Sequence, residues 1–236
     1  EDDVVELLTE VRRRAIGDGE EAFDARQNAS IVVEAERYYR EMVRTDRGSW
    51  NIRDLHMMDT VDRLAAHEGR ASRGVIWAHN THVGDARATS MAAAGLLNIG
   101  QLLRERHGAD QVLLIGMASH SGTVTAAREW GVAEERMPVP IARADGHEGL
   151  LHDALGSPAV LDFGAERTRA WLSHGAGHRA IGVVYDPARE RGNYVPTAMG
   201  ARYDALLWFE QTHALLPLHH ERRPEEVEYE TEPTGF

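Results

Sequence analysis

The stretch that decides the fold of this chain is residues 74–87, which reads Gly74-Val75-Ile76-Trp77-Ala78-His79-Asn80-Thr81-His82-Val83-Gly84-Asp85-Ala86-Arg87. Its apolar first part stops abruptly at two histidines, an asparagine and an aspartate. This pattern predicts a buried strand over residues 75–78 that presents polar groups in the loop after its carboxyl end. In α/β folds the reactive groups gather at that edge of the sheet.

Helical and strand patterns on both sides of this stretch indicate the fold class. Apolar spacing predicts helices at 3–15, 24–44, 51–68, 98–106, 148–155 and 167–172, and strands at 111–117, 159–163, 179–185 and 203–209. Because helices and strands alternate, we expect an α/β domain with a mixed, largely parallel sheet flanked by helices. The domain would span residues 1–221, with a helical portion up to about residue 70, and the polar tail at 222–236 would be exposed.

The composition excludes several classes of function. The net charge of −12 argues against nucleic acid as a partner, and no apolar run approaches the roughly 18–20 residues of a membrane span. Because the chain has no lysine and no cysteine, Schiff-base lysine, P-loop lysine and thiolate chemistry are all excluded. The acidic start lacks the pattern of a signal peptide, so we expect a cytoplasmic protein that acts on a small molecule.

The strongest candidate for a functional site is the group His79, Asn80, His82 and Asp85. Histidines can pass protons or polarise a carbonyl near neutral pH, which suits acid–base catalysis with Asn80 and Asp85 as substrate-binding groups. One alternative is a metal site in which Asp85 or His56 joins the two histidines. Another is a loop capped by hydrogen-bonding side chains. Because only two firm ligands are present, we expect no metal ion and no other cofactor.

A second polar cluster opens the helix predicted at 51–68. Trp50 would contact the substrate, Arg53 could hold a carboxylate through a bidentate pair, and Asp54 could fix the tautomer of a histidine. His56 is a further candidate for catalysis. The alternative is a capped helix start whose charged side chains are solvated.

Two other polar segments carry weaker signals. Ser119 and His120 begin a hydroxyl-rich loop at 119–125 that could offer backbone N–H groups to a substrate anion, and a plain strand–helix turn is the alternative. This segment is not a Gly-x-Ser-x-Gly nucleophile elbow, so a serine hydrolase is not indicated. His147 and His152 are five residues apart, which puts them on different faces of a helix, and we expect both at the surface rather than in a zinc site.

Several of these segments occur together, in the same order, in one known family. They are Gln27-Asn28, Arg37-Tyr38-Tyr39, Trp50-Asn51-x-Arg53-Asp54-x-His56-Met57, Trp77-Ala78-His79-Asn80-x-His82-Val83-Gly84-Asp85, Asn98-Ile99-Gly100-Gln101, Gly122-Thr123-Val124-Thr125-Ala126 and Arg179-Ala180-Ile181-Gly182-Val183-Val184-Tyr185. Over about residues 20–215 the chain therefore resembles the erythromycin esterase-like proteins. The His79-Asn80-x-His82 segment is the most specific part of the resemblance.

The resemblance implies a structure and an activity. The structure would have a deep cleft, with the helical N-terminal portion forming one side of it. The activity would be that of a metal-independent hydrolase, which opens a macrolide lactone or another ester with histidine-activated water and without a covalent intermediate, and so gives resistance to a macrolide antibiotic. By the same resemblance His79 and His82 line the catalytic cleft, and Arg53, Asp54 and His56 are further candidates.

In this family the catalytic base is a histidine in a Glu-x-x-His motif, and it lies in an N-terminal half that has no counterpart in this sequence. We therefore expect the chain to be the C-terminal part of the family's length and to need that N-terminal half as a partner. Two alternatives keep the same scaffold. One is a biosynthetic enzyme, such as a dehydratase or a hydrolase of a non-macrolide product, and the other is a non-catalytic binding subunit that lacks the base.

Overall fold

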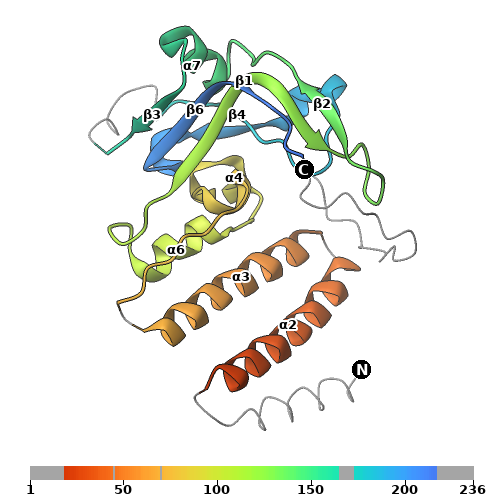
Figure 1. The fold of residues 1–236 in the computed structure, drawn as a ribbon, viewed down its shortest axis with the longest axis vertical. Helices are drawn as coiled ribbons and strands as arrows, with labels where there is room; N and C mark the ends of the chain where they lie inside the picture. Colours follow the sequence, from red (N-terminus) through yellow and green to blue (C-terminus); the bar gives the residue numbers. More distant parts are fainter. Residues whose placement is uncertain (1–18, 45, 70, 165–172, 217–236) are drawn as a thin grey trace.

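The computed structural model describes residues 19–44, 46–69, 71–164 and 173–216, and a group of helices in it lies against a layer of strands (Figure 1). Helices α2 (Glu20–Met42) and α3 (Asp46–Glu68) pack side by side, and α6 (Ile99–His107) lies between α3 and the strands. Glutamates in the first turn of α2 and Arg40 in its last turn complement the helix dipole. None of the described helices is long and apolar enough to cross a membrane.

The described strands form two sheets. The larger sheet has the order β2-β1-β6-β3 and consists of β1 (Ile115–Ala126), β2 (Glu135–Val139), β3 (Ala159–Asp162) and β6 (Ala205–Thr212). In it β1 and β6 are parallel, whereas β2 pairs with β1 and β3 pairs with β6 in the antiparallel direction. The smaller sheet is the antiparallel pair of β4 (Gly175–Arg179) and β5 (Tyr194–Ala198), and α7 (His147–Leu155) contacts both β4 and β1.

Short helical turns connect these larger elements. They are α4 (Asn80–Val83), η1 (Ala86–Ala88), α5 (Ser90–Ala93), η2 (Pro187–Asn193) and α9 (Met199–Arg202). The turn α4 contacts both α6 and β1, so it links the helices to the sheet. This turn contains the polar residues that follow the apolar run in the sequence.

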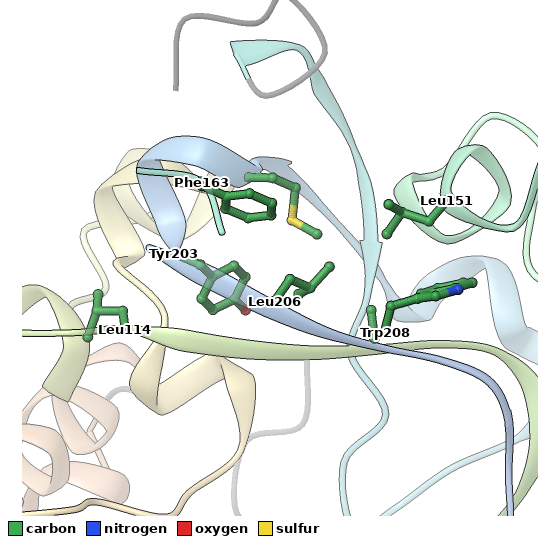
Figure 2. Packing of buried hydrophobic residues seen from close by; sticks show 8 residues of the cluster. Leu114, Leu151, Phe163, Tyr203, Leu206 and Trp208 are labelled. Carbon is green, nitrogen blue, oxygen red and sulfur yellow. The ribbon is translucent and has the colours of Figure 1, made fainter. Parts of the chain in front are cut away.

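Two of the three apolar clusters in the described part of the chain fix the main helices and the larger sheet. The first joins the larger sheet to α7 and α9 and contains Leu114, Ala118, Leu151, Phe163, Met199, Tyr203, Leu206 and Trp208 (Figure 2). In the second, Met58 of α3 packs against Ile99 and Leu102 of α6. Since burying one large apolar side chain contributes about 1.5–3 kcal/mol, these contacts fix α6 on α3.

Most of the expected elements are confirmed. The helices expected at 24–44, 51–68, 98–106 and 148–155 correspond to α2, α3, α6 and α7. The strands expected at 159–163 and 203–209 correspond to β3 and β6. The helices expected at 3–15 and 167–172 and the tail at 222–236 lie outside the described residues.

The prediction of a buried strand at 75–78 is wrong. Residues 72–79 have no regular secondary structure, and Val75 and Trp77 are 93% and 83% exposed. Ile76, between them, packs against the cluster around Met58. An apolar run becomes a strand only where a neighbour supplies hydrogen bonds, and no strand pairs with this run within the described part of the chain.

Four further expectations about the strands and their sheet need correction. The loop expected at 119–125 is the second half of β1, because β2 and β6 pair with this segment from both sides. The strand expected at 111–117 begins only at Ile115, and the one expected at 179–185 is replaced by β4, which ends at Arg179. Among the described strands the larger sheet has one parallel pair, so it is mixed but not largely parallel.

A single methyl group at Gly100 tests the packing of α6 on α4, because a Cβ at this position would overlap the carbonyl oxygen of Val83. We expect Gly100→Ala to lower the free energy of unfolding by about 1–3 kcal/mol in urea denaturation, as overpacking does. The control is Gly182→Ala, since Gly182 has open space around it and a negative φ. That variant should change stability by less than about 0.5 kcal/mol, and equal losses in both variants would contradict the close packing.

Candidate active site

The turn at α4 is held in place by the side chain of Asn98, which is fully buried at the amino end of α6. Its Nδ2 donates hydrogen bonds to the carbonyl oxygens of Thr81, at 2.6 Å, and Gly84. Its Oδ1 accepts hydrogen bonds from the backbone N–H groups of Ala86, at 3.3 Å, and Gln101, at 3.0 Å. One amide side chain thus caps α6 and satisfies the backbone of the polar turn, which fixes the histidines on it.

Three residues of α3 at helical spacing, Trp50, Arg53 and Asp54, lie close together on the side of His82. The buried Asp54 accepts a hydrogen bond at Oδ1 from Nδ1 of His82, at 2.9 Å. The Trp50 ring stacks on the His82 ring with a centroid distance of 4.9 Å and an interplanar angle of 6°. The Arg53 guanidinium carbon lies 4.8 Å from the centre of the Trp50 ring. These contacts fix the orientation of His82. The N–H at Nδ1 points to Asp54, so Nε2 is the nitrogen left for chemistry.

A cavity of about 360 Å³ opens beside α4. Its polar lining includes His79, Asn80, Ser119, Glu148 and Arg179. Its apolar lining includes Met117, Val124, Ile181 and Phe209. A few polar groups in a mostly apolar wall are typical of a small-molecule site, and the volume is at the lower end of the range of about 300–1,000 Å³.

His79 caps the amino end of α4 at the wall of this cavity. Its Nδ1 accepts from the backbone N–H of Thr81 at 3.3 Å and lies 2.8 Å from Oγ1 of the same threonine. The ring keeps contact with solvent at the cavity, but the protein atoms packed around it desolvate it. This burial is the main reason why the pKa of His79 lies below its usual value. A hydrogen bond with the Ile181 backbone raises the pKa, but the nearby His82, Arg202 and His178 lower it again. His79 is therefore neutral at pH 7 with its proton on Nε2, which makes it a hydrogen-bond donor.

At the wall of the cavity lies a pair of fully buried residues that the sequence did not indicate, Glu148 of α7, which lines the cavity, and His178 of β4. Nδ1 of His178 and Oε1 of Glu148 are 2.6 Å apart. Burial raises the pKa of Glu148, but its interactions with His178 and the Arg179 backbone together outweigh this, so the pKa lies below the usual value. The other oxygen, Oε2, has no hydrogen-bond partner among the described groups. Periodicity alone does not distinguish Glu148 from a solvated glutamate on an amphipathic helix.

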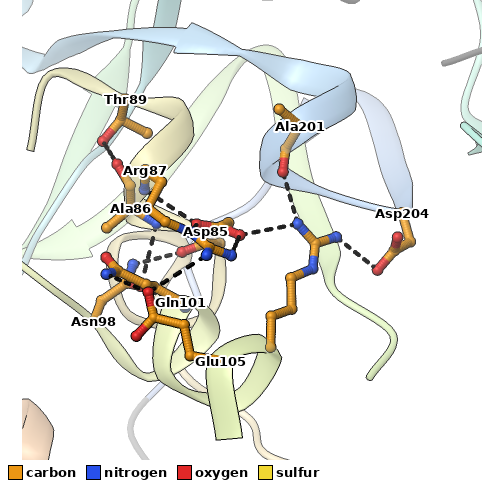
Figure 3. A network of polar contacts seen from close by, with 11 residues as sticks. Asp85, Ala86, Arg87, Thr89, Asn98, Gln101, Glu105, Ala201 and Asp204 are labelled. Carbon is orange, nitrogen blue, oxygen red and sulfur yellow. Dashed lines mark hydrogen bonds and ion pairs between the residues drawn. The ribbon is translucent and has the colours of Figure 1, made fainter. Parts of the chain in front are cut away.

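Asp85 lies away from the cavity, in a network of ion pairs at the start of η1 (Figure 3). Arg87 donates to both of its oxygens, at 2.9 and 2.7 Å, and Arg104 donates to Oδ2 at 3.1 Å. Arg104 continues to Asp204 at 3.0 Å. Although burial raises the pKa of Asp85, the hydrogen bonds from these arginines lower it more, so the carboxylate stays ionised. In this structure Asp85 holds the turn instead of facing a substrate.

The other predicted site residues, Ser119, His120 and His56, do not lie together. Ser119 lines the cavity from β1, whereas the next side chain, His120, stacks on His152 of α7 with ring centroids 3.7 Å apart. His56 lies apart from His82. Burial is the main cause that lowers the pKa of His56, followed by Arg63, while Glu34 of α2 raises it. The structure therefore brings Trp50, Arg53 and Asp54 to His82, and Ser119 to His79 and Asn80, but leaves His56, His120 and Asp85 outside both groups.

The expectation that His147 and His152 both lie at the surface is wrong for His147. His147 is buried, and its Nε2 lies 2.8 Å from the carbonyl oxygen of Thr197 in β5. His152 is partly exposed, with its Nδ1 at 2.6 Å from Glu210. The two histidines have separate partners, as their spacing predicted, but the smaller sheet covers the face that holds His147.

No group of three or more His, Asp or Glu side chains that could hold a metal ion is found in the described part of the chain. His79 and His82 lie three residues apart in the same segment, but Asp85 is bound by arginines and His56 lies apart from the two histidines. The described residues thus offer no complete ligand set of the kind that the His-x-x-His spacing could have begun.

Comparison with known proteins gives one family and several solved structures. The sequence pattern of the erythromycin esterase family matches residues 1–212. A succinoglycan biosynthesis protein matches with a TM-score of 0.70 and 18% identity, over 87% of this chain and 48% of its own. A protein from Bacillus cereus matches with a TM-score of 0.65 and 18% identity, and the match covers 89% of this chain and 50% of that protein. A mutant of erythromycin esterase EreC in its open conformation matches with a TM-score of 0.55 and 18% identity, and the match covers 89% of this chain and 52% of that protein. The chain thus spans about half the length of the structures it matches.

The buried His147 makes stability depend on pH in a predictable direction. Burial is the largest cause that lowers its pKa from the usual value of about 6.5, so below that pH the unfolded chain binds a proton that the folded chain does not. We expect the free energy of unfolding to fall as the pH is lowered from about 6.5 towards the folded pKa. His147→Gln keeps a donor for Thr197, so its stability should fall less over this range.

The matched control for this experiment is the same variant at pH 8, where His147 is neutral in both states and the difference gives the cost of the substitution alone. Urea denaturation at intervals between pH 8 and pH 5 is the measurement. Parallel curves for the two proteins would show that His147 takes up its proton equally in the folded and unfolded states.

Proposed function

Because this chain belongs to the erythromycin esterase family, we propose that it is the portion of a carboxylic ester hydrolase that carries the His79 and His82 side of the active site. The substrate would be a macrolactone or another natural-product ester, cleaved by water without a covalent intermediate, a metal ion or another cofactor. The observation that carries this proposal is the buried Asp54 bound to His82, next to a cavity lined by His79.

His82 is suited to transfer a proton. A carboxylate bound at Nδ1 fixes the tautomer and stabilises the imidazolium that forms when Nε2 takes up a proton. Trp50 on the face of the ring keeps Nε2 in one direction, and Arg53 next to Trp50 can attract the carboxylate that ester hydrolysis produces. We therefore assign to His82 the protonation of the leaving alkoxide, with Asp54 as its positioning partner.

His79 is suited to stabilise the oxyanion. A neutral imidazole with its proton on Nε2 can move this hydrogen bond from the Ile181 backbone to the negative oxygen that develops on the carbonyl. Asn80 and Ser119 lie next to it in the cavity wall and would contact the substrate, while the apolar residues would cover its hydrocarbon surface. A histidine supplied by the N-terminal half of the enzyme would activate the water.

Segment 74–78 supports the need for that N-terminal half. It carries Val75 and Trp77 almost fully exposed, directly before His79. Exposed large apolar side chains on a segment without backbone partners are typical of a surface that another part of a protein covers. We propose that the N-terminal half covers this segment and brings its own histidine towards His79 and His82.

A second candidate function is a biosynthetic enzyme with the same scaffold, either a dehydratase or a hydrolase of a non-macrolide ester. The match to a succinoglycan biosynthesis protein favours it, because that structure has the higher TM-score of the two relatives with a functional name. The acid–base groups of the site can serve either water addition or water elimination. Mass spectrometry on a panel of macrolides, simple esters and hydroxylated sugars separates these reactions by the gain or loss of one water.

The proposed hydrolysis is tested by mass spectrometry of erythromycin incubated with the protein together with the N-terminal half of the enzyme. We expect a product heavier by one water molecule. His79→Ala and Asp54→Asn should each lower kcat/KM by about 100-fold or more, because the first removes the oxyanion donor and the second disturbs the tautomer of His82.

The control for Asp54→Asn is Asp62→Asn, on the same helix. Asp62 also binds a histidine, His107, with 2.8 Å between His107 Nε2 and Asp62 Oδ1, but this pair is solvent-accessible. The control should keep wild-type activity. Full activity in both His79→Ala and His82→Ala would rule out the assignment of the site.

Coverage of segment 74–78 is tested by the fluorescence of Trp77, which is the most exposed large aromatic side chain among the described residues. We expect the emission of the protein to shift to shorter wavelength when the N-terminal half is added, because Trp77 leaves water. In Trp77→Ser the shift should be lost and the two parts should bind at least about tenfold more weakly, as for a central aromatic contact. Val43→Ser, at another exposed apolar residue, is the control and should bind normally. An unchanged spectrum on tight binding would place the interface elsewhere.

A further inference from the structure

Glu148 and His178 form the most deeply buried pair of titratable groups in the described part of the chain, with both side chains fully inaccessible to solvent. The pair takes no part in the hydrolysis as proposed above. Burying a carboxylate and an imidazole costs free energy that an apolar pair of similar size would not. A pair of this kind at the wall of a cavity therefore indicates a task beyond packing.

The hydrogen bonds of Glu148 define the protonation of its partner. Oε1 accepts from the backbone N–H of Arg179, at 2.9 Å, and lies 2.6 Å from Nδ1 of His178. Because Glu148 is ionised, it can only accept, so Nδ1 of His178 carries a proton. The other nitrogen, Nε2, faces Asn80 and Tyr203.

The orientation of the Asn80 amide decides whether Nε2 of His178 accepts or donates. Its Nδ2 donates to the carbonyl oxygen of Met117 at 2.6 Å, and its Oδ1 accepts from the N–H of Met117 at 3.1 Å. The reverse orientation of the amide would place two oxygens together and two N–H groups together, so the assignment is fixed. The second N–H of the amide then points to Nε2 of His178, at 3.4 Å, and the Tyr203 hydroxyl lies at the same distance. Nε2 is therefore an acceptor.

We infer that Glu148 and His178 are positioning residues that act through Asn80: they orient its amide on the backbone of Met117 and thereby hold the amino end of α4, with His79, at the cavity. Asn80 is the first residue of α4 and His79 is its N-cap, so a shift of one moves the other. Arg202 also holds the amino end of α4, because it donates a hydrogen bond to the carbonyl oxygen of Asn80 at 3.0 Å.

The inference rests on the proposed function only for its effect on catalysis, since it assumes that His79 contacts the substrate. The hydrogen-bond chain itself can be observed without any substrate. Long-range ¹H–¹⁵N NMR spectra of the imidazoles show which nitrogen of each histidine carries the proton. In the wild-type protein we expect His178 to carry it on Nδ1 and the side-chain amide of Asn80 to exchange slowly with water.

Two variants of Glu148 separate positioning from a requirement for charge. Glu148→Gln keeps an acceptor oxygen for His178 and for the Arg179 N–H, so the tautomer of His178, the Asn80 amide signal and most of the activity should remain. Glu148→Ala removes the acceptor. In it the Asn80 amide should exchange faster, the pKa of His79 should rise towards its usual value, and kcat should fall about 100-fold with little change in KM, since a displaced catalytic group costs that much.

The control is Asp62→Asn, which removes the carboxylate from the exposed pair with His107 and should leave the titration of His79 unchanged. A proton on Nε2 of His178 in the wild-type protein would overturn the inference, even if Glu148→Ala does not fold. An equal loss of activity in Glu148→Gln and Glu148→Ala would also overturn it, because the charge rather than the acceptor would then matter. If the spectra agree but the wild-type enzyme hydrolyses no ester, the proposed function fails and the positioning of α4 stands.

Discussion

The amide of Asn80, bound to both backbone groups of Met117, is the contact on which the rest of the site depends. It replaces the hydrogen bonds that a neighbouring strand would give to β1 at this position, and it attaches a four-residue helix to the sheet. A helix this short has little stability of its own, because the formation of the first turn is costly and few hydrogen bonds follow. Its geometry therefore comes from side chains that reach it from other elements. Asn98, at the amino end of α6, and Arg202, of α9, donate hydrogen bonds to its backbone carbonyl oxygens.

Two polar environments meet at this short helix, and they differ in what they do to a histidine. His82 is bound at Nδ1 by a buried carboxylate, which fixes the orientation of the ring. His79 lies among protein atoms with cationic groups nearby, and these favour the neutral ring. Two histidines three residues apart in the sequence thus acquire different chemical properties. The proposed hydrolysis needs both an oxyanion donor and a group that transfers a proton, and this difference in surroundings would divide the two roles between the histidines.

The acidic residues around the site differ in what they bind. Asp54 and Glu148 each bind one histidine, whereas Asp85 binds only arginines. Its network with Arg104 and Asp204 reaches the backbone N–H of Leu114, just before β1. An ionised carboxylate with several arginine donors is a strong support for a turn and a poor ligand for a neutral substrate. The same family motif therefore contributes site residues at its start and a structural clamp at its end.

The sequence by itself determined the helices α2, α3, α6 and α7, the strands β3 and β6, and the position of the polar stretch that became the site. These features depend on periodicity and on residue type over short distances, which are present in any one segment. It also indicated that Trp50, Arg53 and Asp54 form a polar cluster at the start of a helix. The tertiary structure alone decided that 119–125 is strand and 75–78 is not, because a strand exists only where another segment pairs with it. It alone decided that Asp54 meets His82, that Asp85 does not face the cavity, and that Glu148 and His178 are partners. Glu148 and His178 are 30 residues apart and lie on different elements, and no local pattern records a hydrogen bond that forms only when those elements pack.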